Sequence, residues 1–247
     1  MSTLQILWIN TLVIFVYMTA LWAVSLVLKD AGIGRSFWGL GFVVSVVVYF
    51  IFSQGYTLRK ILLLVLVAIW GLRLSFYVFS QNYGRPEDPW YQAMRARWGA
   101  AFWWTGYFQV FFTQGVLMLV VSVCLVAAQN GTAADRVTAW DIVGLLVWLI
   151  GFFLVFMDDR RLTRFKHFDH NREQMTDGGL RRYLRYPNYL GEAVIWWGYF
   201  LIAVAAGGWW SFFSPILMTL LMLRTSGVIS LKKRRAAPYD AAKDSVS

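Results

Sequence analysis

Long apolar runs are the feature that most constrains this chain. A membrane-spanning helix needs about 20 mostly apolar residues. Hydrophobic residues make up 59% of the chain and charged residues 15%, which excludes an ordinary soluble domain and a disordered chain. We therefore predict an all-α, polytopic membrane protein with seven transmembrane helices. The seven apolar runs lie at roughly 4–28, 37–54, 60–80, 107–129, 139–158, 187–206 and 209–225.

We predict that the runs form one integral membrane domain over residues 1–247. No internal repeat is visible in the sequence. The first run follows no basic residue and precedes no small-residue cleavage pattern, so we expect a membrane helix and not a cleaved signal. Gly207-Gly208 separates the last two runs and predicts a tight hairpin.

The distribution of basic residues predicts the orientation of the chain. The sequence has 23 Lys and Arg against 13 Asp and Glu, a formal net charge of +10. If the N-terminus is outside, 18 basic residues fall in the inner loops and tail and only three in the outer loops. Positive charge is retained on the cytoplasmic side of membrane proteins. We therefore predict an outer N-terminus and a cytoplasmic C-terminus, and we expect no nucleic-acid partner for these charges.

The predicted inner loop at 159–186 carries more charge than topology needs. It has eight basic residues and only four acidic ones. Structureless loops of this length are usually functional. We interpret the loop as a recognition site for an anionic group; a solvated role in topology alone is the alternative.

Polar residues inside the runs indicate a cavity, because ionisable groups within a membrane usually face a partner or a water-filled space. Arg73 and Tyr77 are four residues apart, so they share one face of the third helix. In the predicted orientation, these two residues and the four named below lie in the inner half of the membrane, which indicates a cavity open to the cytoplasm. Pairing between helices and snorkelling are the alternatives. The other members of the set are Gln109, Gln114, Glu192 and Arg224.

The segment before the sixth run predicts an anion site at a helix start. Pro187 suits the first position of a helix, and the N–H groups that follow it are free to bind an anion beside Arg185. Asn188, Tyr189 and Glu192 share one helix face, and the glycine among them leaves room for close approach. A phosphate-bearing ligand fits this pattern. A capped interfacial helix is the alternative.

Metal chemistry has little support in this sequence. The single Cys124 lies in an apolar run, which excludes an internal disulfide and a cysteine cluster. His167 and His170 are the only histidines, and they lie in a positively charged loop. We expect no metal site.

Several ordered motifs resemble the bacterial branch of the steroid 5-alpha-reductase-like membrane proteins, which is related to sterol reductases and isoprenylcysteine carboxyl methyltransferases. Residues 185–192, R-Y-P-N-Y-L-G-E, are similar to the R-H-P-N-Y-x-G-E signature of that family. Residues 159–166 resemble its D-x-Q-x-x-x-F-K segment. The similarity runs over roughly residues 38–235. Further matches are Trp70–Leu74 to W-G-x-R-L, Glu87–Tyr91 to E-D-x-R-Y, Gln114–Leu117 to Q-x-x-L, and Thr225–Val228 to S-G-I-P.

The resemblance implies a seven-helix NADPH-dependent reductase in the bacterial inner membrane. Hydride would pass to a carbon–carbon double bond conjugated to a ketone on a sterol-like lipid, within a substrate cavity in residues 1–130. Tyr77 would polarise the ketone oxygen, with Arg73 beside it. Membrane lipids and a lipid-like substrate are the expected partners. The cofactor-binding half would be residues 139–240, with NADPH held by Asp159, Arg164, Lys166, Asn171, Arg185, Tyr186, Asn188, Tyr189, Glu192, Arg224 and Tyr239.

Some positions depart from the family pattern. The Gln-Glu pair that eukaryotic relatives carry on the second helix is missing here, so the substrate is expected to be an enone lipid that is not narrowed to 3-oxo-steroids. A methyltransferase of the isoprenylcysteine carboxyl type, using S-adenosylmethionine, is one alternative. A channel, transporter or scaffold is another, although transporters usually show internal repeats. The other departures are Trp90, Arg161, Tyr186 and Lys232.

Overall fold

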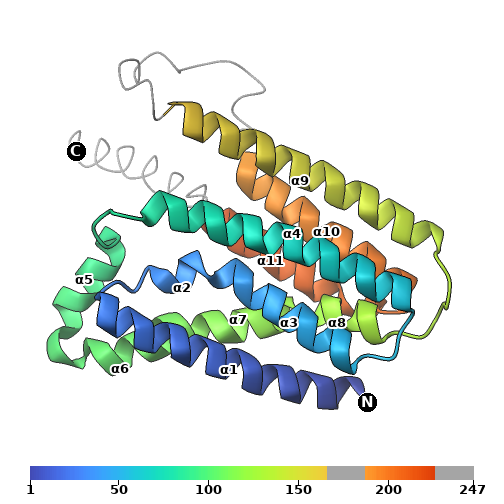
Figure 1. The fold of residues 1–247 in the computed structure, drawn as a ribbon, viewed down its shortest axis with the longest axis horizontal. Helices are drawn as coiled ribbons and strands as arrows, with labels where there is room; N and C mark the ends of the chain where they lie inside the picture. The colour runs from blue at the N-terminus through green and yellow to red at the C-terminus, as the bar shows by residue number, and fades with distance from the viewer. Residues whose placement is uncertain (166–186, 226–247) are drawn as a thin grey trace, which may run out of the picture. The chain divides into compact units, whose positions relative to one another are not determined.

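The computed structural model describes residues 1–165 and 187–225, and every regular element in these ranges is helical (Figure 1). This confirms the all-α prediction for the described chain. The main helices are α1 (Thr3–Leu28), α2 (Ile33–Ser36), α3 (Trp38–Phe52), α4 (Thr57–Asn82), α5 (Pro89–Trp98), α6 (Phe102–Gly106), α7 (Thr113–Val121), α8 (Val123–Asn130), α9 (Ala139–Phe165), α10 (Pro187–Ala205) and α11 (Phe213–Thr225). Short 3-10 or π turns occupy Gly99–Ala101, Tyr107–Phe112 and Trp209–Phe212.

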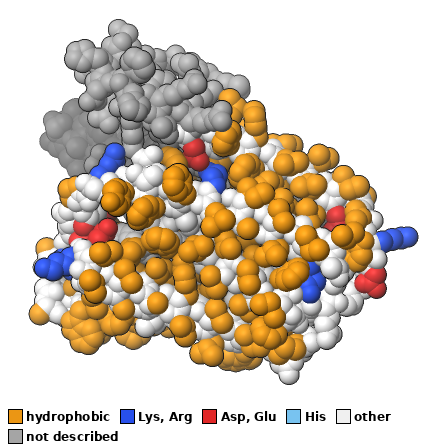
Figure 2. All heavy atoms as spheres, in the orientation of Figure 1, with side chains coloured by type: hydrophobic (Ala, Val, Ile, Leu, Met, Phe, Trp, Pro, Cys, Tyr) orange, Lys and Arg blue, Asp and Glu red, His pale blue; other side chains and the backbone are white. Residues whose placement is uncertain are grey.

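Four helical segments among the described residues are long and apolar enough to cross a membrane. Hydrophobic side chains also cover most of the face in Figure 2, where charged side chains are few. Both observations indicate a membrane protein. The four segments are Thr3–Leu28, Thr57–Asn82, Pro89–Asn130 and Ala139–Asp159, and the 15-residue helix Trp38–Phe52 is apolar but shorter.

The chain divides into two compact units, and each is described by itself. Unit 1 comprises Met1–Gly144 with Tyr199–Ser214. Unit 2 comprises Leu145–Gly198 with Pro215–Ser247, within which residues 145–165, 187–198 and 215–225 are described. Helices α9, α10 and α11 each contribute residues to both units.

Unit 1 is built around a close contact between α3 and α4, which lie alongside each other in Figure 1. A Cβ atom on Gly39 would lie 2.6 Å from the carbonyl oxygen of Gly71, and one on Gly71 would lie equally close to that of Gly39. The Leu40 N–H donates to Ser75 Oγ at 2.9 Å, which joins the same two helices. Neither glycine can therefore carry a side chain without moving the helices apart.

The fourth apolar run is helical but irregular. It begins with a π-helical turn at Tyr107–Phe112, and α7 ends at Val121 before α8 begins at Val123. A separate helix, α5, precedes this run and was not expected from the apolar pattern, because its ten residues include two arginines and are on average polar. Its N-terminus is capped by Asp88, whose side chain accepts from Trp90 N at 2.9 Å.

The fifth run forms a longer helix than expected, whereas the sixth keeps its predicted bounds within one residue. Helix α9 continues to Phe165, so Asp159 and Arg164 belong to a helix and not to the predicted loop at 159–186. An apolar pattern ends where the charges begin, whereas backbone hydrogen bonding can continue through charged residues that favour helices. The tight turn at Gly207-Gly208 is confirmed, since Gly207 takes a φ of 85° between α10 and the following 3-10 turn.

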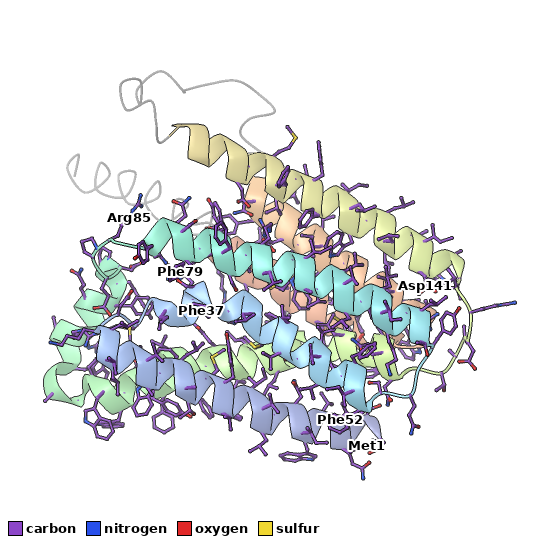
Figure 3. The ribbon with its side chains drawn as sticks, viewed as in Figure 1. Met1, Phe37, Phe52, Phe79, Arg85 and Asp141 are labelled. Atoms are coloured by element: carbon purple, nitrogen blue, oxygen red, sulfur yellow. The ribbon has the colours of Figure 1, made fainter. Side chains whose placement is uncertain are left out.

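A buried ion pair joins the starts of α4 and α9 within unit 1, near the Asp141 label in Figure 3. Arg59 is 2% exposed and Asp141 4% exposed. Arg59 Nε donates to Asp141 Oδ1 at 2.7 Å and Nη2 donates to Oδ2 at 3.0 Å. Arg59 also donates to the carbonyl of Ala134, and Asp141 accepts from Thr138 N. The pair therefore holds the connection before α9 against the start of α4.

Substitution of Asp141 by Asn should destabilise the protein. The change leaves the Arg59 charge buried without its counter-charge, and losing one partner of a buried ion pair costs about 3 kcal/mol. Thermal unfolding of the purified protein in detergent measures the effect. Asp135→Asn, on an exposed side chain of the same connection, is the matched control. Equal unfolding temperatures for the two variants would contradict a stabilising pair.

Candidate functional site

The candidate site in unit 2 is positioned by a backbone contact between α9 and α10. A Cβ atom on Gly191 would lie 2.8 Å from the carbonyl oxygen of Gly151 and 2.6 Å from Val155 Cγ2. A Cβ on Gly151 would lie 2.7 Å from the backbone nitrogen of Ile195. The space that the sequence predicts beside Gly191 is thus filled by α9, and the glycine serves helix packing.

The register of this contact brings Asp159 and Asn188 to the same end of the helix pair. The contacts show that α9 and α10 run antiparallel, with Val155 beside Gly191. Asp159 lies one turn beyond Val155, and Asn188 lies about one turn before Gly191. The Oδ1 atoms of both side chains are shielded from solvent. Within the described part of the chain, no group donates a hydrogen bond to Asn188 Oδ1.

Helix α10 begins as the sequence predicts, with Pro187 as its first residue. One turn into the helix, the carboxyl group of Glu192 is buried, with the residue 4% exposed. Tyr189 is half-buried. The first N–H groups of a helix have no partner within it. This end of the pair therefore combines backbone donors, an amide and two carboxylates, a set that suits hydroxyl and amide groups of a ligand.

The remaining residues expected to bind the cofactor are only partly covered. Arg224 is described, and its side chain is exposed in the last turn of α11. Arg164 belongs to α9, but its side chain lies outside the described residues. Also outside the described residues are Lys166, Asn171, Arg185, Tyr186 and Tyr239.

Unit 1 carries the two residues expected to be catalytic. Arg73 and Tyr77 are half-buried and four residues apart on α4, so they share a face as predicted. Gln109 is exposed on the π-helical turn, whereas Gln114 is half-buried, with its Oε1 shielded from solvent. A common cavity for these side chains and the α10 residues stays a prediction.

The acidic motif that begins at Glu87 has a structural function which the sequence did not reveal. Glu87 Oε1 accepts from Arg95 Nη2 at 3.0 Å and from the backbone N–H of Ala31 at 2.9 Å. Asp88 forms an ion pair with Arg35 at 3.2 Å. These contacts attach the start of α5 to Ala31, in the connection between α1 and α2, and to Arg35 in α2. Asp followed by Pro is a common start of a helix, and this signal indicates the cap but not its distant partners.

Comparison with known proteins identifies one family. A family model described as a protein of unknown function, DUF1295, matches residues 21–245. No curated protein and no solved structure matches the chain.

Substitution of Gly191 by Ala should separate α9 from α10. The added Cβ would overlap the Gly151 carbonyl and Val155, and overpacking of this kind costs roughly 1–3 kcal/mol. Thermal unfolding measures the loss. Gly106→Ala is the matched control, because its Cβ would meet only the Phe102 ring at 3.4–3.5 Å, an ordinary contact. A Gly191 variant as stable as the Gly106 variant would argue against the close contact.

Proposed function

This chain belongs to the DUF1295 family, and from that premise we propose that it is a membrane reductase that uses NADPH to reduce the conjugated carbon–carbon double bond of an enone lipid. The observation that carries the proposal is the shared end of α9 and α10, where the register of the two helices places Asp159 and Asn188, and where Glu192 is buried one turn after the helix start. These are residues of the segments that resemble the steroid 5-alpha-reductase-like proteins. Other family motifs occur in the expected order along the chain.

The donors and acceptors at this end fit part of the cofactor. The carboxylates of Asp159 and Glu192 can accept hydrogen bonds from ribose hydroxyls or from a carboxamide, and the Asn188 amide oxygen can accept another. Carboxylates repel phosphates, so the phosphates need cations. The basic residues between positions 164 and 185 supply the positive charge that phosphates require, and the guanidinium groups among them can donate paired hydrogen bonds. NADPH, when bound, supplies the hydride.

The enone substrate, which accepts the hydride, needs a hydrogen-bond donor at its ketone oxygen. Reduction of the double bond moves negative charge onto that oxygen, and a donor placed there stabilises the transition state. We assign this donor to the Tyr77 phenol. Arg73, one turn away on the same face of α4, contributes positive charge. The protein thereby orients and polarises the substrate.

The membrane setting completes the proposal. We propose seven spans, an outer N-terminus and a cytoplasmic C-terminus in the bacterial inner membrane. Helices α1, α3, α4 and α10 follow four of the predicted runs within a few residues, which supports this arrangement. The substrate would be a lipid-like molecule that enters from the bilayer.

Titration with NADPH and with S-adenosylmethionine tests the cofactor. We expect NADPH to bind, and Asn188→Ala to weaken binding at least several-fold through loss of a buried acceptor. Arg185→Ala should do the same through loss of a phosphate contact. Asn82→Ala, on α4, is the matched control and should leave the affinity unchanged. Binding of S-adenosylmethionine alone would favour the methyltransferase instead.

Turnover of a conjugated enone lipid tests the catalytic assignment. Tyr77→Phe removes only the phenol oxygen, and loss of one such donor typically lowers kcat by about 100-fold or more. Cofactor affinity should stay the same. Tyr83→Phe, on a residue that is 76% exposed, is the matched control. Undiminished turnover in the Tyr77 variant would remove this residue from the mechanism while leaving the cofactor assignment intact.

A further inference from the structure

Unit 1 contains a cluster of fully buried polar side chains that the proposed reductase site does not use. Its members come from α1, α3 and the α7–α8 region, which contact one another (Figure 1). Each has an exposure of 0%. Polar groups so deeply buried need hydrogen-bond partners, and in a membrane they cannot obtain them from surrounding solvent. The members are Asn10, Ser45, Tyr49, Ser122 and Gln129.

Three members form a hydrogen-bonded chain with a defined direction. Asn10 Nδ2 donates to Tyr49 OH at 2.7 Å, and Tyr49 OH lies 2.8 Å from Ser122 Oγ. Ser122 Oγ donates to the Leu119 carbonyl at 3.0 Å. Because Ser122 uses its one hydroxyl proton on Leu119, Tyr49 must donate to Ser122 and accept from Asn10. Neither hydroxyl proton, of Tyr49 or of Ser122, is then left to bond to Asn10 Oδ1.

Three oxygen atoms of the cluster lack a hydrogen-bond partner within the described residues: Asn10 Oδ1, Ser45 Oγ and Gln129 Oε1. All three side chains adjoin one turn of α3. Asn10 bonds to Tyr49 at the end of that turn, Ser45 begins it, and Gln129 Nε2 donates to the Val46 carbonyl within it at 3.4 Å. If the oxygen and nitrogen of the Asn10 amide were exchanged, the nitrogen would lack an acceptor. In either orientation, one polar atom of this amide therefore lacks a hydrogen-bond partner within the described residues.

We propose that these three oxygens surround an internal hydration site, in which water donates to the Asn10 and Gln129 amide oxygens and accepts from the Ser45 hydroxyl. Water fits because it supplies two donors and needs two to four polar partners. A ligand that offers only acceptors would leave the two amide oxygens unsatisfied. The cluster contains no carboxylate, so a buried cation would have no counter-charge. This site is independent of the proposed reductase function.

The connection between α3 and α4 closes the site at one end. Gly55 N donates to the Gln129 carbonyl at 3.1 Å, and a Cβ on Gly55 would overlap that carbonyl. Next to it, the Asn130 side chain accepts from Gln54 N at 3.1 Å and donates to Thr3 Oγ1 at 2.9 Å. These bonds fix the connection against the end of α8 that carries Gln129.

Hydroxyl-radical labelling by X-ray radiolysis tests the site, because radicals formed from bound water modify the side chains that touch it. The full chain is irradiated in nanodiscs and analysed by mass spectrometry. We expect Tyr49 to be modified although it is 0% exposed. Trp70, equally buried and packed against the rings of Phe42 and Tyr199, should stay unmodified. Asn10→Leu should lower Tyr49 modification several-fold.

Thr11→Val is the matched control for Asn10→Leu, because the Thr11 hydroxyl donates to the Leu7 carbonyl of its own helix. It should leave Tyr49 modification unchanged. If Tyr49 in the unsubstituted protein is modified no more than Trp70, the proposal is overturned, whatever the variants do. A stabilisation by Na⁺ that disappears in Asn10→Leu would also overturn it, because the site would then hold a cation.

Discussion

Backbone contact between helices at glycine is the constraint on which packing in both units depends. In unit 1, Gly39 and Gly71 bring α3 against α4, and in unit 2, Gly151 and Gly191 bring α9 against α10. Helices in a membrane gain little from the hydrophobic effect when they associate, so close van der Waals contact between small residues replaces it. Gly71 and Gly191 also belong to the two motifs with the clearest chemistry. Each motif thus places a packing glycine within two residues of an arginine or a glutamate.

Charge has two different functions in this chain. Arg59 and Asp141 neutralise each other in a buried pair, and Asp88 with Arg35 joins the start of α5 to α2. These charges hold helix ends together. A simple count of basic residues by side treats all of them as topology signals, because a one-dimensional count contains no information about pairing. The basic segment after α9 is the part of the surplus left for ligand recognition in the proposed function.

The apolar pattern predicted the helices better than their ends. Helices α1, α4 and α10 follow their runs closely because apolar residues fill whole turns there. The pattern missed α5, which is polar, and the extension of α9 through residue 165, where charged residues continue the helix. It also did not reveal the π-helical turn at Tyr107–Phe112, which departs from the α-helical spacing that the pattern assumes.

By itself, the sequence determined that this chain is helical and that its long apolar segments suit a membrane, because composition and run length decide both. It also placed Asn188, Tyr189 and Glu192 on one helix, since their spacing matches the helical repeat. Only the tertiary structure decided that Asp159 lies at the same end of a helix pair as Asn188, and that Asn10 bonds to Tyr49. The physical reason is that local spacing determines which face of a helix a residue occupies, whereas the glycine contacts between helices determine the register at which two faces meet.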